Sequence, residues 1–393
     1  MKYLQIVIMA LFACMPVSLR GERTVQNINQ GWLFSPDSVV WRSVDLPHDF
    51  QIESPWIAPD ANESFKSDPS IATVKSRLSA RGFKEMGKGY YTKSFIPDPA
   101  WKYKRVLLDF EGIMLTGEVR FNGERIGGTN YGYLGFEADI TDKIRWNENN
   151  VISVTADTGE PENSRWYTGG GLYRDVNIII TDPEQYFARN PLSITVPDIR
   201  RDRAVVVLNA EITSHNKPDS VEVEIAIAAP DGTVLYSRRK SYRSNPRQTT
   251  REFHLDSIEI ADPVLWDVDT PSLYTLIVSV IKSDGTTADS VSEHFGIRKL
   301  EYSPEFGLKL NGRKVILKGI ANHHTLGALG AASYPRAMEK RLQLLKDFGF
   351  NHIRTSHNPY SKSFLDLCDR YDAPRHAVQR LGRYLLSADE NLA

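Results

Sequence analysis

Short segments of alternating apolar and polar residues dominate the chain from about residue 24 to residue 296. Residues 150–156 alternate in this way, and residues 105–110 and 176–180 form short apolar runs. Segments of this length, separated by glycine-rich turns, predict β-strands rather than helices. The pair Asn122-Gly123 predicts a two-residue β-hairpin, because both turn positions require a positive φ angle. We therefore expect a mainly β structure over this stretch.

The β-rich stretch divides into two predicted domains near Asp182-Pro183. Residues 21–185 have the many short strands and tight turns of a jelly roll. Residues 186–297 have a strand spacing that suits an immunoglobulin-like β-sandwich, although the paired cysteines of antibody domains are lacking. The strands expected in this second domain are 204–213, 220–228, 234–242 and 274–282, with turns at Asp231-Gly232 and Asp284-Gly285.

After Gly296 the pattern changes. Asn311-Gly312, between the apolar segments 308–310 and 315–317, predicts another hairpin, and residues with helical spacing follow it. A helix is expected here. Its first turn contains Pro335, and Gly349 ends it. A short strand at 351–355 and a second helix follow it. Strands and helices in alternation are typical of a parallel sheet or a βα barrel. The apolar positions of the two helices are Met338, Leu342, Leu345, Phe364, Leu365 and Cys368.

Composition and charge exclude several classes of protein. The chain has 393 residues, of which 41% are hydrophobic and 25% charged, so it is not of the disordered class. The net charge is −1 and the pI about 6.8, so the basic surplus of a nucleic-acid binder is lacking. A neutral partner such as a carbohydrate fits these values. Only two cysteines are present, Cys14 and Cys368, and they form no CxxC pair.

The first residues predict an export signal. Lys2 is followed by a short apolar core at residues 4–12, and polar residues begin near Ser18. Such a core is too short to span a bilayer, and no later apolar run is long enough. We expect residues 1–20 to be a signal peptide, which implies a secreted or periplasmic protein. Cys14 loosely resembles a bacterial lipoprotein cleavage site, so a lipid anchor at this residue is the alternative.

The candidate chemistry lies in two segments, 318–327 and 351–360, each of which follows or contains a predicted strand. In a βα barrel the loops after the strands form the active-site face, so their side chains are expected to converge. The cluster offers donors and acceptors for sugar hydroxyls, and an arginine in it is suited to hold a carboxylate. Its members are His323, His324, Arg354, His357 and Asn358.

Each of these residues also has a simpler interpretation. The pair His323-His324 is compatible with a metal site, but suitably spaced carboxylate or cysteine ligands are lacking, so we expect neither a metal nor a cofactor. Arg354 is compatible with a structural ion pair. Single histidines in loops usually form ordinary hydrogen bonds. The joint placement after two successive strands favours a binding site.

Residues 351–359 together with 364–371 resemble the signature of glycoside hydrolase family 2, which includes β-galactosidases, β-glucuronidases and β-mannosidases. Residues 46–49, 89–91 and 164–175 resemble segments of the sugar-binding domain of that family. The resemblance extends over residues 25–371. It implies a galactose-binding-like jelly roll, an immunoglobulin-like sandwich and the N-terminal part of a (β/α)8 TIM barrel at 298–371.

The resemblance also implies roles for residues. His324, Arg354 and His357 match positions that line the sugar pocket of the family, and His323 and Asn358 match more loosely. Ser164 and Arg165 stand where the first domain reaches over the pocket rim, with a strand-end hydrogen bond and a solvated charge as the simpler interpretations.

Retaining hydrolysis needs two carboxyl groups about 5–5.5 Å apart. In this family both are glutamates on later barrel strands, and neither motif is present in this sequence. Glu390 and Asp389 lack the family context. We therefore expect the chain alone to be inactive.

The sequence after Tyr371 departs from the family pattern. A (β/α)8 barrel takes about 250 residues, whereas 97 residues follow Gly296. We interpret residues 372–393 as a divergent tail and hypothesise a frameshift or a gene remnant. Val378, Leu381 and Leu385 have the spacing of a short amphipathic helix.

The expected function is that of a family 2 glycosidase, most specifically a β-galactosidase, because residues 323–330 look like that type, although Thr325 stands where an acidic residue is expected. The expected partner is a β-galactoside or a similar carbohydrate. We expect no nucleic acid as a partner, and a homo-oligomer is possible. The alternatives are a non-catalytic carbohydrate-binding module and an inert gene remnant. Aromatic residues that bear on the binding module are Trp32, Trp41, Trp56 and Trp166.

Overall fold

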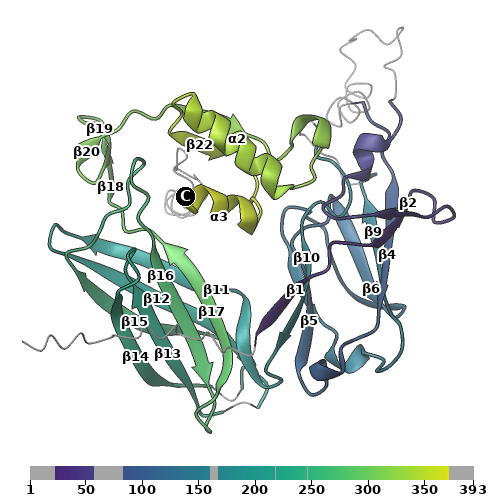
Figure 1. The fold of residues 1–393 in the computed structure, drawn as a ribbon, viewed down its shortest axis with the longest axis horizontal. Helices are drawn as coiled ribbons and strands as arrows, with labels where there is room; N and C mark the ends of the chain where they lie inside the picture. The colour runs from purple at the N-terminus through teal and green to yellow at the C-terminus, as the bar shows by residue number, and fades with distance from the viewer. Residues whose placement is uncertain (1–22, 57–82, 160–166, 217, 246, 371–393) are drawn as a thin grey trace, which may run out of the picture.

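The computed structural model describes residues 23–56, 83–159, 167–216, 218–245 and 247–370. Figure 1 shows two β domains beside each other, with a smaller C-terminal part (yellow-green) that lies over both. The mainly β, three-part organisation expected from the sequence is confirmed. None of the helices in these residues is long and apolar enough to cross a membrane.

The N-terminal domain is a sandwich of two antiparallel sheets, with strand orders β1-β10-β5-β8 and β3-β2-β4-β9-β6-β7. Its core contains Trp32, Phe110 and Phe121, whose side chains are fully buried. The hairpin at Asn122-Gly123 is present, and both residues have the positive φ angles that its turn requires. The elements are β1 Thr24–Asn27, β2 Trp32–Ser35, β3 Arg42–Val44, η1 Phe50–Glu53, β4 Lys88–Phe95, η2 Pro99–Trp101, β5 Arg105–Phe110, β6 Thr116–Phe121, β7 Glu124–Thr129, β8 Phe136–Asp139, η3 Thr141–Lys143, β9 Asn150–Asp157 and β10 Val176–Thr181.

The second domain is also a two-sheet sandwich, with strand orders β11-β12-β15 and β14-β13-β16-β17. In β13 every second residue from Val221 to Ile227 is buried, because successive side chains of a strand point to opposite faces. The four strands expected from the sequence are present as β12, β13, β14 and β16. The elements are β11 Gln185–Ile199, β12 Arg203–Ser214, β13 Ser220–Ala228, β14 Val234–Arg243, β15 Thr250–Ala261, β16 Tyr274–Ile281 and β17 Thr287–Phe295.

The C-terminal part combines a small antiparallel sheet, β18-β19-β20, with a parallel pair, β21 and β22. Residues 315–317, expected to be a strand, form none. The first parallel strand is instead Gly319–Asn322, and the side chain of Ile316 is 72% exposed. The elements are β18 Leu300–Ser303, β19 Gly307–Leu310, β20 Arg313–Lys314, β21 Gly319–Asn322, η4 Gly327–Leu329, α2 Pro335–Asp347, β22 His352–Thr355 and α3 Lys362–Arg370.

Helix α2 follows the sequence prediction closely. Pro335 lies in its first turn, where a missing N–H costs nothing, and Gly349, with φ of 77°, follows its end. Met338 and Leu342 face inward and pack in one cluster with Ile353 of β22 and with helix α3. Strand, helix, strand and helix therefore form one small βα layer.

A buried ion pair joins the two β domains. Asp289 of β17 is fully buried and accepts hydrogen bonds from Arg23 Nε (2.9 Å) and Nη2 (2.8 Å). It also accepts one from the backbone N–H of Phe187 at 2.8 Å, and Arg23 Nη2 donates to the Phe187 carbonyl at 2.7 Å. A buried carboxylate is tolerated only when donors of this kind surround it.

We expect Asp289→Ala to lower the free energy of unfolding of the paired β domains by about 3 kcal/mol, because it leaves the Arg23 charge enclosed without its partner. Urea unfolding followed by tryptophan fluorescence measures the loss as a lower midpoint. Asp219→Ala, at an exposed position, is the matched control. Equal midpoints for the two variants would contradict a stabilising role for this ion pair.

Candidate functional site

The candidate site is built on the parallel pair β21 and β22. Gly319 pairs with His352 and Asn322 with Thr355, so both strands end at the same edge of the sheet. His323 and His324 follow β21 directly. Residues 356–358 follow β22. The loops after parallel strands therefore lie together, as the sequence predicted.

Arg354, His357 and His323 form the exposed rim of this edge. Arg354 Nη2 lies 2.8 Å from His357 Nδ1, and its Nη1 donates to Ser356 Oγ at 3.1 Å. Because a guanidinium only donates, His357 Nδ1 must accept, and the ring proton lies on Nε2. The rings of His323 and His357 meet edge to face with centroids 6.2 Å apart. The rim therefore presents neutral imidazole and cationic donors together.

His324 has a different environment from the rim. Its ring packs edge-on against Tyr133 and Tyr173 of the N-terminal domain, with centroid distances of 5.1 and 5.9 Å. Its Nε2 lies 3.1 Å from the Thr168 carbonyl, which accepts, so Nε2 carries the proton. Burial lowers the pKa of His324 to about 4, an effect that the Thr168 carbonyl opposes and that Arg174 and other nearby cations strengthen. The ring is therefore neutral at neutral pH.

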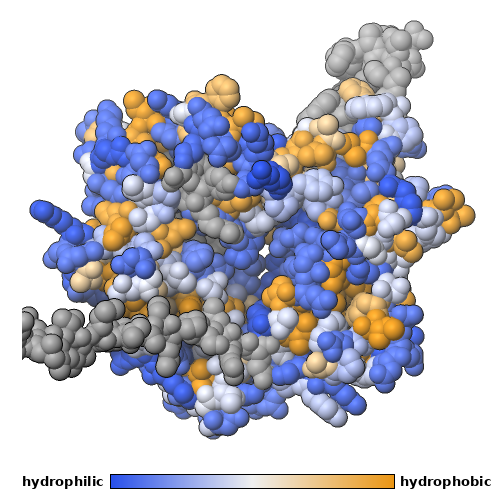
Figure 2. All heavy atoms as spheres, in the orientation of Figure 1, coloured by the Kyte–Doolittle hydropathy of each residue, from blue (hydrophilic) through white to orange (hydrophobic). Residues whose placement is uncertain are grey.

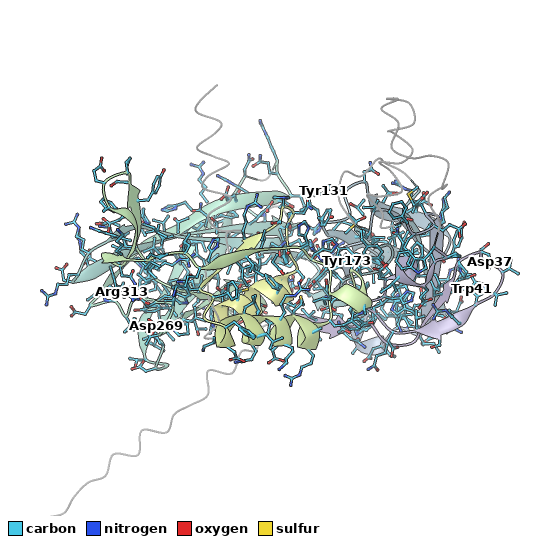
Figure 3. All side chains as sticks on the ribbon, turned by 90° about the horizontal axis from the view of Figure 1, so that it is seen from above. Asp37, Trp41, Tyr131, Tyr173, Asp269 and Arg313 are labelled. Atoms are coloured by element: carbon cyan, nitrogen blue, oxygen red, sulfur yellow. The ribbon has the colours of Figure 1, made fainter. Side chains whose placement is uncertain are left out.

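Asn358 is also held by the N-terminal domain. Tyr131, in the loop between β7 and β8, donates its hydroxyl to Asn358 Oδ1 at 2.6 Å. Arg174, whose side chain is almost fully buried, donates from Nη2 to the Pro359 carbonyl at 2.7 Å and from Nη1 to the Tyr133 carbonyl at 3.0 Å. In Figure 3 Tyr131 and Tyr173 lie between the yellow helices and the N-terminal domain. One wall of the site thus comes from that domain.

Asp49 is the central contact between the N-terminal domain and the barrel segment. Its carboxylate is 3% exposed and accepts four hydrogen bonds. Burial raises its pKa, and the four donors act in the opposite direction. The donors are the N–H groups of Gln51 (3.1 Å), Gly170 (2.9 Å) and Ala331 (2.7 Å) and the hydroxyl of Tyr167 (2.8 Å).

Two glycines allow this close approach. Gly330 has φ of 65°, and a Cβ there would lie 2.3 Å from Asp49 Oδ2. Gly169 has φ of 76°, and a Cβ there would lie 2.5 Å from the Cβ of Ala331. Any other residue at either position would push the barrel segment away from the carboxylate.

The structure brings His323, Arg354 and His357 together at the rim, and it places His324 and Asn358 at the domain interface. Ser164 and Arg165 lie outside the described residues. Sequence reasoning did not identify Tyr131, Tyr133, Tyr173 and Arg174 as part of the site, because their contacts join segments far apart in the chain. Asp49 lies in the segment 46–49 that resembles the family, but its bridging role was not predicted.

The site has hydrogen-bonding groups but no acid pair of its own. Between residues 319 and 370 the carboxylates are Glu339, Asp347, Asp366 and Asp369, and all four lie on helices α2 and α3 rather than at the strand ends. Within the described parts of the chain, no group of three or more His, Cys, Asp or Glu side chains is placed to hold a metal ion. The arrangement suits recognition of neutral hydroxyl groups.

Comparison with known families gives three consecutive matches. The model "Glycosyl hydrolase 2 galactose-binding domain-like" matches residues 67–189. "Glycosyl hydrolases family 2" matches residues 193–298, and its TIM barrel domain matches residues 305–373.

Curated proteins agree with these matches. The chain is 33% identical to the β-galactosidase BoGH2A of Bacteroides ovatus over 374 residues, which are 92% of this chain and 42% of that protein. It is 29% identical to a β-glucuronidase of Bacteroides fragilis over 369 residues, 90% of this chain and 49% of that protein. The chain thus spans less than half the length of these relatives.

Among solved structures, a glycosyl hydrolase family 2 member from Bacteroides cellulosilyticus aligns with a TM-score of 0.75 at 33% identity, covering 88% of this chain and 44% of that one. A β-glycosidase from Bacteroides vulgatus aligns with a TM-score of 0.74 at 31% identity, covering 88% and 43%. Two β-sandwich domains followed by the first βα units of a barrel define a multidomain protein of the glycosidase class. The chain belongs to glycosyl hydrolase family 2.

Asp49→Asn is expected to loosen the barrel segment from the N-terminal domain. The substitution replaces one carboxylate oxygen, which accepts hydrogen bonds, by an NH2 group, which cannot accept from the N–H and O–H donors around it. An unsatisfied buried donor costs about 1–3 kcal/mol, so the amides of Gly170 and Ala331 should exchange about tenfold faster or more. Hydrogen–deuterium exchange mass spectrometry measures this directly. Asp45→Asn, at an exposed position whose carboxylate accepts from the Gly31 N–H, is the control. Unchanged exchange at Ala331 in the Asp49 variant would contradict the bridging role.

His324 is expected to titrate near pH 4 in an NMR titration of the intact chain, with the signal assigned by its loss in His324→Gln. Its folded pKa lies below the ordinary value of about 6.5. The stability that comes from the neutral ring is therefore complete above about pH 6.5 and is lost as the pH falls toward 4. The stability difference between the wild type and His324→Gln should shrink over the same range. Titration near 6.5 would show that the ring is open to solvent.

Proposed function

We propose that the chain is the sugar-recognising part of a family 2 β-galactosidase, and that these 393 residues alone do not hydrolyse the glycosidic bond. The proposal places a terminal β-linked galactose against the rim of Arg354, His357 and His323, beside the wall formed by the N-terminal domain. The observation that carries it is the convergence of these groups at the ends of β21 and β22.

The chemistry of the rim supports recognition rather than bond cleavage. Retaining hydrolysis needs one carboxyl group as acid and base and a second as nucleophile, about 5–5.5 Å apart. The carboxylates of residues 319–370 all lie on helices α2 and α3 and not at the ends of β21 and β22. The family resemblance assigns both catalytic glutamates to later barrel strands. In the whole enzyme, His357 Nε2–H and the Arg354 guanidinium would donate to hydroxyl oxygens of the bound sugar.

A neutral galactoside is favoured over a glucuronide. Two of the Arg354 N–H groups already donate to Ser356 and His357. His324 is neutral and bound to the Thr168 carbonyl, so it adds no charge for a sugar carboxylate. The Bacteroides ovatus relative named β-galactosidase shares 33% identity and the relatives named β-glucuronidase share 29%, whereas other relatives named β-galactosidase share 23–29%.

Export of the protein is part of the same proposal. The charged and apolar pattern of residues 1–20 motivates it, and these residues lie outside the described part of the chain. A lipid anchor at Cys14 is the alternative. Mass spectrometry of the mature N-terminus from cells that express the full chain distinguishes cleavage without lipid from acylation at Cys14.

Hydrolysis assays test the function. We expect no release of nitrophenol from β-galactoside, β-glucuronide or β-mannoside substrates by the purified chain alone. A chimera that continues residue 370 with the C-terminal part of the Bacteroides ovatus relative should hydrolyse the galactoside in preference to the other two. The chimera supplies the absent carboxyl groups while keeping the rim of this chain.

Arg354→Ala in the chimera should lower kcat/KM for the galactoside about tenfold or more, because a charge-assisted hydrogen bond contributes about 1.5–3 kcal/mol. Arg336→Ala, on the exposed side of α2, should leave it unchanged. Turnover by the chain alone would contradict the argument from the carboxylates. Faster hydrolysis of the glucuronide would contradict the choice of sugar.

A further inference from the structure

A second hollow lies in the N-terminal domain and shares no residue with the rim. It has a volume of about 630 Å³ and opens between edge strand β1, the end of β4 and the short helix η2. Small-molecule sites span about 300–1,000 Å³, so its size suits a ligand of one or two sugar rings. Its lining includes Gln26, Gln30, Lys93, Phe95, Asp98 and Trp101.

The lining combines an apolar surface with several polar groups. Trp101 is half-buried and packs against Phe95 with ring centroids 6.1 Å apart, and the nearly buried Ile28 and Ile178 extend this apolar surface. Around it stand the exposed amides of Gln26 and Gln30, which both donate and accept. Sugars have the same two-sided character, with apolar C–H faces and a ring of hydroxyls.

The charges around the hollow balance. Lys93 contributes one positive charge and Asp98 one negative charge, and the remaining lining residues are neutral. An anionic ligand such as a phosphate or a uronic acid would meet the Asp98 carboxylate as well as the lysine. A neutral saccharide, by contrast, finds donors and acceptors of both kinds without an unpaired charge.

The walls of the hollow are held in place before any ligand binds. Lys93 Nζ donates to the Gln30 carbonyl at 2.5 Å, which fixes the chain after β1. Asp98 Oδ1 accepts from the Ala100 N–H at 2.9 Å and so caps η2, the helix that carries Trp101. Trp32 donates from its buried indole to the Ile28 carbonyl at 2.7 Å. Preformed walls reduce the entropy lost on binding.

From this combination we infer that the hollow is a second, non-catalytic saccharide site, which holds a neutral mono- or disaccharide unit against Trp101. It is separate from the proposed galactose pocket, and neither depends on the other.

Titration of the full chain with β-1,4-galactobiose, cellobiose and mannobiose, and with digalacturonate as the anionic comparison, tests the inference. In ¹H–¹⁵N NMR spectra the indole N–H signal of Trp101 should shift in a saturable way with at least one neutral disaccharide, with Kd on the order of 1 mM. The signal of the core residue Trp32 should stay in place. Digalacturonate should produce no saturable shift.

Variants separate this site from the rim. Gln26→Ala and Gln30→Ala change exposed side chains and should each weaken binding several-fold without unfolding the domain. Trp101→Phe, which keeps an apolar ring, should weaken binding less than Trp101→Ala. Trp41→Ala, at a tryptophan on the β2–β3 loop that does not line the hollow, is the matched control and should bind as the wild type does.

Two results would overturn the inference. One is the absence of a saturable Trp101 shift with all three neutral disaccharides. The other is binding that survives the Gln26, Gln30 and Trp101 changes but is lost in Arg354→Ala, because it would place the only saccharide site at the rim. Neither result affects the hydrolysis assay of the chimera, so failure here is distinguishable from failure of the proposed galactosidase function.

Discussion

The buried carboxylate of Asp49 is the interaction on which the arrangement of the site depends. The barrel segment has a small core of its own, formed mainly by α2, α3 and β22, and it lies against the N-terminal domain. A buried charge is stable only when nearly every oxygen lone pair has a donor. Three of the four donors to Asp49 lie in the N-terminal domain, and the fourth, the Ala331 N–H, comes from the barrel segment. Docking of the barrel segment therefore supplies the fourth donor to the carboxylate.

This constraint explains why the N-terminal domain contributes to a site that the barrel strands define. Once Ala331 is bound to Asp49, Tyr133 and Tyr173 enclose His324, and Arg174 reaches the loop after β22. Burial beside these rings, together with the nearby Arg174 charge, keeps the imidazole neutral. The candidate site is therefore walled by two domains.

The sequence predicted strands well where buried and exposed residues alternate without interruption, and less well where this alternation changes phase. Strand β13 alternates without interruption and was predicted with its observed bounds. Strand β15 was missed because its buried side changes phase between Leu255 and Ile258, where the pairing with β12 is irregular. Of the five barrel residues expected near the strand ends, three lie together at the rim and two, His324 and Asn358, lie at the domain interface. The tyrosines and Arg174 were not predicted. Their contacts link positions more than 150 residues apart, and periodicity carries no information on such pairs.

The tryptophans show why aromatic content alone does not identify a sugar site. Trp32 is core, and Trp56 is 72% exposed but carries the Lys84 ammonium 4.0 Å from its ring centroid. Trp41 is 39% exposed and lies on the β2–β3 loop next to the exposed Val39 and Val40. Figure 2 shows the hydropathy of the surface, on which apolar side chains are scattered among polar ones. Trp101, which the sequence did not single out, lies in a hollow that also has amides and balanced charges. Stacking needs an open ring face, and specificity needs polar groups around it. Only the folded positions of the neighbouring residues distinguish these cases.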